Sequence, residues 1–214
     1  MNSIVCFWTG TNPMSAQRKA CLAQLREKSE CEVCLVTPDN LANFILKDHP
    51  LHPAYEFLSE THKSDYLRTY FMNFHGGGYS DIKATTGSWK SAFAALAADE
   101  GKWMNGYPEI PTGVAYLPHA KYWNVLVGNG AYICKPNTPL TNLWYSEMIK
   151  LLDERFEALR ENPARHPQDQ RGLDGSKYPL EWNEMLGRIF HRVSYDLREH
   201  ILNTLPISIF HSYR

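Results

Sequence analysis

The chain has 214 residues and carries 22 Lys and Arg against 23 Asp and Glu, which gives a formal net charge of −1. This length favours one domain over two, because domains usually contain about 100–200 residues. The near-neutral charge argues against a broadly basic nucleic-acid-binding or membrane-surface protein, and a hydrophobic share of 43% argues against a largely disordered chain.

The first part of the chain alternates between strand and helix patterns. Residues 3–8 predict a buried strand, residues 15–28 an amphipathic helix and residues 32–37 a second strand. A strand–helix–strand start is typical of an open α/β sheet, which binds its ligands at the carboxyl ends of its strands. Here these ends lie near residues 7–10 and Thr37.

A predicted helix over residues 61–75 carries an acid and a base on one surface. Asp65 and Arg68 are three positions apart, so they are neighbours on a helix. The three glycines at 76–78 end this helix and allow a sharp turn into residues 79–83, which bring another aspartate. The sequence therefore concentrates polar groups at this turn.

The remaining pattern is that of further helices and strands separated by loops. It predicts helices at 87–98, 139–160 and 182–191, strands at 114–117, 131–134 and 205–210, and irregular loops at 101–111 and 162–179. The last of these loops is rich in Pro, Gly and charge, and we expect it to act as a mobile lid. Together the elements predict a single α/β domain with a mostly parallel sheet and helices on both faces.

Two features bear on the cellular setting. No apolar run approaches the ~20 residues that span a bilayer, and no basic segment leads into an apolar stretch at the start of the chain. The five cysteines are an odd number. We therefore expect a cytoplasmic protein without membrane insertion and without a nucleic acid partner.

Residues 62–83 resemble the central motif of the DXD-containing GT-A glycosyltransferases. This group includes capsular-polysaccharide-synthesis proteins, clostridial glucosylating toxins and glycosyltransferase domains of large algal viruses. Its pattern is an acid on a helix, an arginine three positions on, and then Gly-Gly-x-Tyr-x-Asp-x-Asp. Asp65, Arg68, Tyr79 and Asp81 match this pattern in order and spacing.

The resemblance implies a fold and an activity. The fold is one GT-A (Rossmann-like) domain over residues 1–214, with a nucleotide-binding part at about 1–90 and an acceptor part at about 91–214. The activity is transfer of a sugar from a UDP-sugar to a carbohydrate acceptor, as in polysaccharide biosynthesis. UDP-glucose is the first expectation for the donor, and a UDP-deoxyhexose such as UDP-rhamnose is the second.

The resemblance also assigns donor-binding residues. They are Phe7, Thr9, Gly10, Asp65, Arg68, Tyr79, Asp81, Lys83 and Trp182. Phe7, Thr9 and Tyr79 would line the uridine pocket. Asp65 and Arg68 would hold the sugar and its oxygens.

One position departs from the family pattern. Lys83 stands where the second acid of the motif usually binds the metal. The resemblance implies that Asp81 holds Mn²⁺ or Mg²⁺ with help from His211, and such hard cations prefer carboxylate and phosphate oxygens. The alternative is that Lys83 points inward and its ammonium neutralises part of the charge of the leaving diphosphate.

The acceptor side offers fewer signals. Besides Asp81, the catalytic candidates are Glu184 and Asp169, either of which could take the acceptor proton as a general base. Acidic residues are mostly exposed, so an ordinary surface role is the more common explanation for both. Trp182 is either a sugar platform or a core residue.

Two other functions compete with glycosyl transfer. A sugar nucleotidyltransferase uses a similar α/β sheet, but its Gly-rich basic loop is missing after the first strand, where Thr11-Asn12-Pro13 follows instead. A non-catalytic module that binds nucleotide sugars or glycans is the second alternative, because Lys83 replaces the metal-binding acid.

Overall fold

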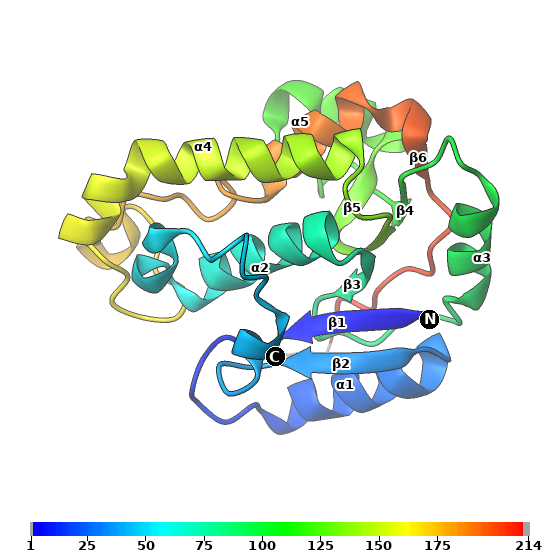
Figure 1. Cartoon of the computed structure of the whole chain (residues 1–214), viewed down its shortest axis with the longest axis horizontal. Helices are drawn as coiled ribbons and strands as arrows, with labels where there is room; N and C mark the ends of the chain where they lie inside the picture. Colours follow the sequence, from blue (N-terminus) through cyan, green and yellow to red (C-terminus); the bar gives the residue numbers. More distant parts are fainter. Residues whose placement is uncertain (1, 212–214) are drawn as a thin grey trace.

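The computed structural model describes residues 2–211, and its centre is one six-stranded sheet (Figure 1). The strands are β1 (Ser3–Phe7), β2 (Glu32–Val36), β3 (Gly77–Ser80), β4 (Met104–Pro108), β5 (Val127–Cys134) and β6 (Ile201–Leu202). Their order across the sheet is β2-β1-β3-β5-β4-β6. Only β5 runs antiparallel to its neighbours, whereas β1 is parallel to β2 and β3, and β4 to β6. The mostly parallel sheet confirms the predicted fold class.

Helices cover both faces of the sheet, as predicted. They are α1 (Ala16–Ser29), α2 (Glu60–Phe74), α3 (Lys90–Ala98), α4 (Pro139–Glu161) and α5 (Gly187–Asp196). Side chains of β1 alternate between two cores: Val5 and Phe7 pack with α2, α4 and α5, and Ile4 and Cys6 pack with α1 and α3. In Figure 1, α2 and α4 lie side by side on one face, and α1 lies along β2 on the other.

Short 3₁₀ helices fill several connections. They span Leu41–Phe44, Pro53–Phe57, Leu117–Val125, Leu173–Gly175 and Arg198–His200. Within residues 2–211, no helix combines the length and the apolar character that crossing a bilayer requires.

The connection from α2 to β3 follows from capping and glycine chemistry. The Ser59 hydroxyl accepts a hydrogen bond from the backbone N–H of His62 and so caps the start of α2. At the other end, Gly76 and Gly77 adopt φ values of +66° and +84°, which side chains with a Cβ rarely tolerate. The chain therefore reverses directly into β3, and Asp81 follows the last residue of that strand.

The sequence pattern misplaced three elements of the second half. Residues 101–111 were expected to form a loop but contain β4, in which Asn105 is buried and its amide donates to the backbone of Ala92 and to Thr204. Residues 114–117 form no strand, and residues 205–210 contribute only one isolated bridge to Thr85. These elements depend on partners far away in the chain, which a local pattern does not contain.

The segment at residues 162–179 is irregular apart from one short 3₁₀ helix, as predicted, and its role as a lid stays a prediction, whereas the helix after it begins later than expected. The loop is held against other elements: Ala164 donates to the backbone of Phe57, and Thr61 at the start of α2 donates to Pro167. The helix begins at Gly187, so Trp182 lies in the turn before it.

Candidate functional site

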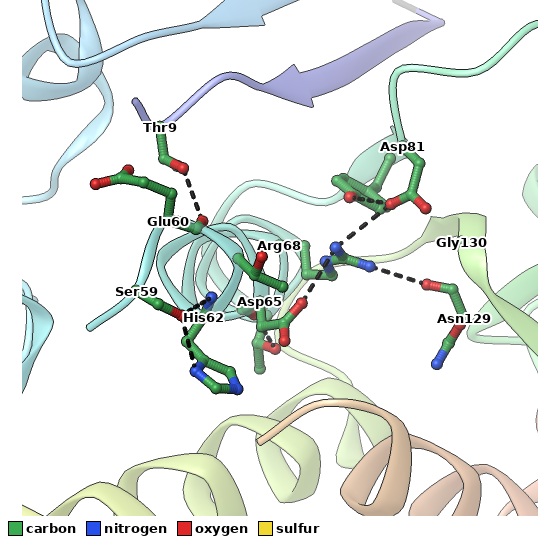
Figure 2. A network of polar contacts seen from close by, with 12 residues as sticks. Thr9, Ser59, Glu60, His62, Asp65, Arg68, Asp81, Asn129 and Gly130 are labelled. Atoms are coloured by element: carbon green, nitrogen blue, oxygen red, sulfur yellow. Dashed lines mark hydrogen bonds and ion pairs between the residues drawn. The ribbon is translucent and has the colours of Figure 1, made fainter. Parts of the chain in front are cut away.

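Charged side chains from α2 and from the end of β3 meet at the carboxyl edge of the sheet (Figure 2). Nη2 of Arg68 lies 3.1 Å from Oδ1 of Asp65 and 3.3 Å from Oδ1 of Asp81. Its Nη1 donates a hydrogen bond of 3.1 Å to the carbonyl oxygen of Asn129 in β5. The structure thus brings together the acid, the arginine and the second acid that the sequence placed in one motif.

Lys83 and Tyr79 complete the surroundings of Asp81. The ammonium of Lys83 donates to Oδ2 of Asp81 at 2.7 Å, and the hydroxyl of Tyr79 donates to Oδ1 at 2.6 Å. The guanidinium of Arg68 lies 4.5 Å from the centre of the Tyr79 ring. One carboxylate is therefore held by two cations and a phenol, and we call Asp65, Arg68, Asp81 and Lys83 the charged network.

The two carboxyl groups of this network have opposite pKa shifts. Burial by itself raises the pKa of Asp81, but Lys83 and Arg68 outweigh burial and lower the pKa to about 2. Burial raises the pKa of Asp65 to about 7, and Arg68 opposes this only in part. Near neutral pH, Asp81 is therefore ionised while Asp65 titrates.

A cavity of about 170 Å³ lies at the carboxyl ends of β1 and β2. Thr9, Thr37, Tyr55 and Lys63 are among its lining residues, so its wall combines hydroxyl groups, an aromatic ring and a cation. The hydroxyl of Thr9 also donates to the backbone carbonyl of Glu60 at 2.7 Å, which fixes the strand end against α2.

Of the three residues expected around the uridine, only Thr9 lines this cavity. Phe7 and Tyr79 are buried in the core, with ring centres 5.7 Å apart. Gly10 follows Thr9 in a bend, where a Cβ would lie 2.5 Å from Oδ1 of Asn12. Phe7 therefore packs in the core rather than in the cavity. Tyr79 contributes to the site through its hydroxyl group, which binds Asp81.

A second, larger cavity of about 620 Å³ borders the charged network at Asn129. Residues 112–118 form one wall, and Trp182, Asn183 and Arg188 are on another. Asn129, whose carbonyl binds Arg68, also lines it. Trp182 is 42% exposed, so the structure favours the platform alternative over a core position.

A buried hydrogen bond between a histidine and a carboxylate anchors the wall of this second cavity. Nε2 of His191 lies 3.0 Å from the Glu109 carboxylate, and Nδ1 of the same ring accepts a hydrogen bond from the backbone N–H of Ala115 at 2.9 Å. Gly113 packs directly on Glu109, because an added Cβ would lie 2.0 Å from its carboxylate.

Sequence reasoning missed Asn183, Arg188 and the wall at 112–118. No local sequence pattern marks them, because the segments that line this cavity lie far apart in the chain.

The two acids considered as general bases are engaged elsewhere. The Asp169 carboxylate is buried and accepts a hydrogen bond from the backbone N–H of Arg165 at 2.8 Å. The Glu184 carboxylate pairs with Arg155 at 3.2 Å and accepts from the backbone N–H of Glu181 at 3.0 Å. Within residues 2–211, no hydrogen bond or ion pair links either acid to the charged network. Their contacts are those of structural residues, and their catalytic role stays a prediction.

The residues around Asp81 do not fit a divalent cation. Both carboxylate oxygens of Asp81 already accept hydrogen bonds, and the residue two positions on is a cation rather than an acid. His211 is exposed in a bend at the end of the described chain. Among residues 2–211, no group of three or more His, Cys, Asp or Glu side chains is arranged to hold a metal. An oxygen-rich ligand shell, which Mn²⁺ and Mg²⁺ prefer, is not assembled here.

Comparisons with known proteins give one informative result. No protein-family model matches the sequence, and no curated protein matches it. Among solved structures, the chain is similar to the PaToxG glycosyltransferase, with a TM-score of 0.51 and 12% sequence identity. The match covers 91% of this chain and 69% of that one. The two chains therefore share a Rossmann-like α/β fold.

Proposed function

We propose that this chain is a glycosyltransferase of the GT-A type, which transfers a sugar from a UDP-sugar to a carbohydrate acceptor. The observation that carries the proposal is the contact of Arg68 with both Asp65 and Asp81 at the carboxyl edge of the sheet. Open α/β sheets bind their ligands at this edge. The shared fold with a glycosyltransferase agrees with it.

In this proposal the donor lies between the smaller cavity and the charged network. The base and ribose fit the cavity beside Thr9 and Thr37, where hydroxyl groups offer hydrogen bonds and apolar atoms cover the base. The sugar lies against Asp65 and Arg68, because a carboxylate accepts hydrogen bonds from sugar hydroxyls and a guanidinium binds sugar oxygens. UDP-glucose is the donor to test first.

The acceptor lies in the larger cavity. Its exposed Trp182 offers a flat ring face on which a sugar can pack, and Asn129 and Asn183 offer amide groups for hydroxyls. The acceptor hydroxyl oxygen bonds to the anomeric carbon of the donor sugar. The bond from that carbon to the diphosphate oxygen breaks, and its electron pair leaves with UDP. The hydroxyl proton is released to solvent.

Release of UDP from UDP-glucose tests the proposal, because water can replace the acceptor. The wild type should release UDP and glucose slowly, with the proton passing to buffer. Asp81→Asn should abolish release, whereas the matched control Asp48→Asn, at an exposed turn, should not.

Two other outcomes would contradict the proposal. Formation of UDP-glucose and pyrophosphate from UTP and glucose-1-phosphate would identify a nucleotidyltransferase. Binding of UDP-glucose without turnover, even with added glycans, would identify a binding module.

A further inference from the structure

The backbone around Lys83 aims its side chain at Asp81. The N–H of Lys83 donates to the carbonyl of Asp81 at 2.6 Å, so the chain makes a tight turn across Ile82. Arg18, from α1, donates to the carbonyl of Ile82 at 2.9 Å and holds this turn in place. The ammonium of Lys83 therefore returns to the carboxylate only two residues before it.

The C-terminal segment covers the same lysine. Ile209 donates a backbone hydrogen bond of 2.8 Å to Ala84, which fixes the segment beside the motif. The ring of Phe210 then lies 4.5 Å from the ammonium of Lys83, within reach of a cation–π contact. Lys83 is only 8% exposed, so its charge is held in a defined position rather than in solvent.

The ammonium of Lys83 occupies the position that a metal ion bound to Asp81 would need. Oδ2 of Asp81 is occupied by Lys83, and Oδ1 is bonded to Tyr79 and lies close to Arg68. A divalent cation could reach Oδ2 only if the ammonium moved away. Otherwise two like charges would stand side by side in a poorly hydrated site, where their repulsion is strong.

We propose that Lys83 replaces the metal ion in the transfer reaction, so that the protein binds UDP and releases it from a UDP-sugar without a divalent cation. This inference rests on the proposed glycosyltransferase function. As the bond from the anomeric carbon to the diphosphate oxygen breaks, the electron pair moves to that oxygen. The fixed charge of Lys83 stabilises the negative charge that develops there, and no proton is transferred. A lysine ammonium suits this role because it is a compact point charge that binds phosphate.

Calorimetric titration with UDP tests the inference directly. The wild type should bind UDP equally well in EDTA and in MnCl₂. Lys83→Met keeps most of the apolar stem beside Phe210 but removes the charge, so in EDTA it should weaken UDP binding by about 10- to 100-fold, the worth of one charge-assisted contact. The matched control Lys47→Met, at an exposed turn, should bind like the wild type. Thermal unfolding of each variant shows whether it is folded.

Lys83→Asp provides the reverse experiment. It places a second carboxylate two residues after Asp81 and removes the ammonium that binds Asp81. The variant should bind Mn²⁺ measurably by electron paramagnetic resonance where the wild type does not, and its UDP binding should require Mn²⁺.

The outcomes separate the two proposals. Loss of wild-type UDP binding in EDTA, with recovery in MnCl₂, would overturn the role of Lys83 and leave the glycosyltransferase function standing. Unchanged UDP binding by a folded Lys83→Met in EDTA would do the same. Absence of UDP binding under both conditions would contradict the glycosyltransferase function and this inference with it.

Discussion

The charged network and the larger cavity beside it are built in opposite ways. The network takes its charges from one stretch of 19 residues, Asp65 to Lys83, and each charged group contacts another. The cavity takes its lining from three distant segments, and its main aromatic residue, Trp182, is exposed. We therefore expect a change of charge in the network to reduce both the stability of the fold and the activity. A substitution in the cavity wall should weaken acceptor binding and leave the stability of the fold unchanged.

The largest loss of stability should follow from a substitution of Arg68. Arg68→Ala leaves the buried carboxylate of Asp65 and the partly exposed carboxylate of Asp81 without their shared cation and removes the partner of the Asn129 carbonyl. Breaking a buried pair in this way costs about 3–5 kcal/mol, so the free energy of unfolding in urea should fall by that amount. UDP release should also be lost. A decrease of less than about 1 kcal/mol would show that the network is not buried enough to behave as described.

Asp81→Asn should have a smaller effect on stability but a large one on activity. It releases Lys83 and Arg68 from their common anchor, and misplaced groups cost about 100-fold in rate. We expect UDP release to fall at least that far, with a native circular dichroism spectrum.

Acid unfolding checks the ionisation of the same residue. Because the folded pKa of Asp81 is lowered to about 2, its stabilising effect is present above the unfolded pKa of about 4 and is lost as pH falls through 2. The wild type should therefore lose more stability than Asp81→Asn over this range. Parallel curves would contradict the assigned ionisation.

Asp65 should make UDP release depend on pH near neutrality. Its pKa is raised to about 7, so the ionised form that accepts hydrogen bonds from the sugar increases about tenfold between pH 6 and pH 8. The kcat/KM of the wild type should rise accordingly, and that of Asp65→Asn should stay flat. For stability the sign is opposite: the protonated form is favoured by folding, so the wild type should lose stability relative to Asp65→Asn as pH rises from about 4 to 7.

Trp182→Ala should have the smallest effect on the donor reaction. Its ring is exposed, so the free energy of unfolding should change by no more than about 0.5 kcal/mol. UDP release to water should be unchanged, whereas transfer to a glycan acceptor should show a higher KM, because one stacking contact of about 0.5–1.5 kcal/mol is lost. An equal loss of both reactions would place Trp182 on the donor side.

Much of the first half of the molecule could be predicted from the sequence because its signals are local. Ser15 does cap α1, the apolar run at residues 3–8 does give β1, and the glycines at 76–78 do deliver Asp81 to the end of β3. The contact of Arg68 with two acids follows from helix spacing and this turn.

The second half depends on contacts that a local pattern does not carry. β4 contains Asn105 and Gly106, which read as loop residues, but Gly106 is needed because a Cβ there would lie 2.6 Å from Val127. Tyr79 was expected to line the uridine pocket, but β3 is central in the sheet and its neighbours bury the Tyr79 ring. Likewise, the direction of Lys83 was open in the sequence, and its ammonium contacts the ring of Phe210, more than a hundred residues away.

A crystal structure of the protein with UDP, grown in EDTA, tests the central claim most directly. The account predicts the base in the cavity beside Thr9 and Thr37, and a diphosphate oxygen within hydrogen-bond distance of Lys83. UDP bound away from the carboxyl edge of the sheet, with the charged network untouched, would contradict it.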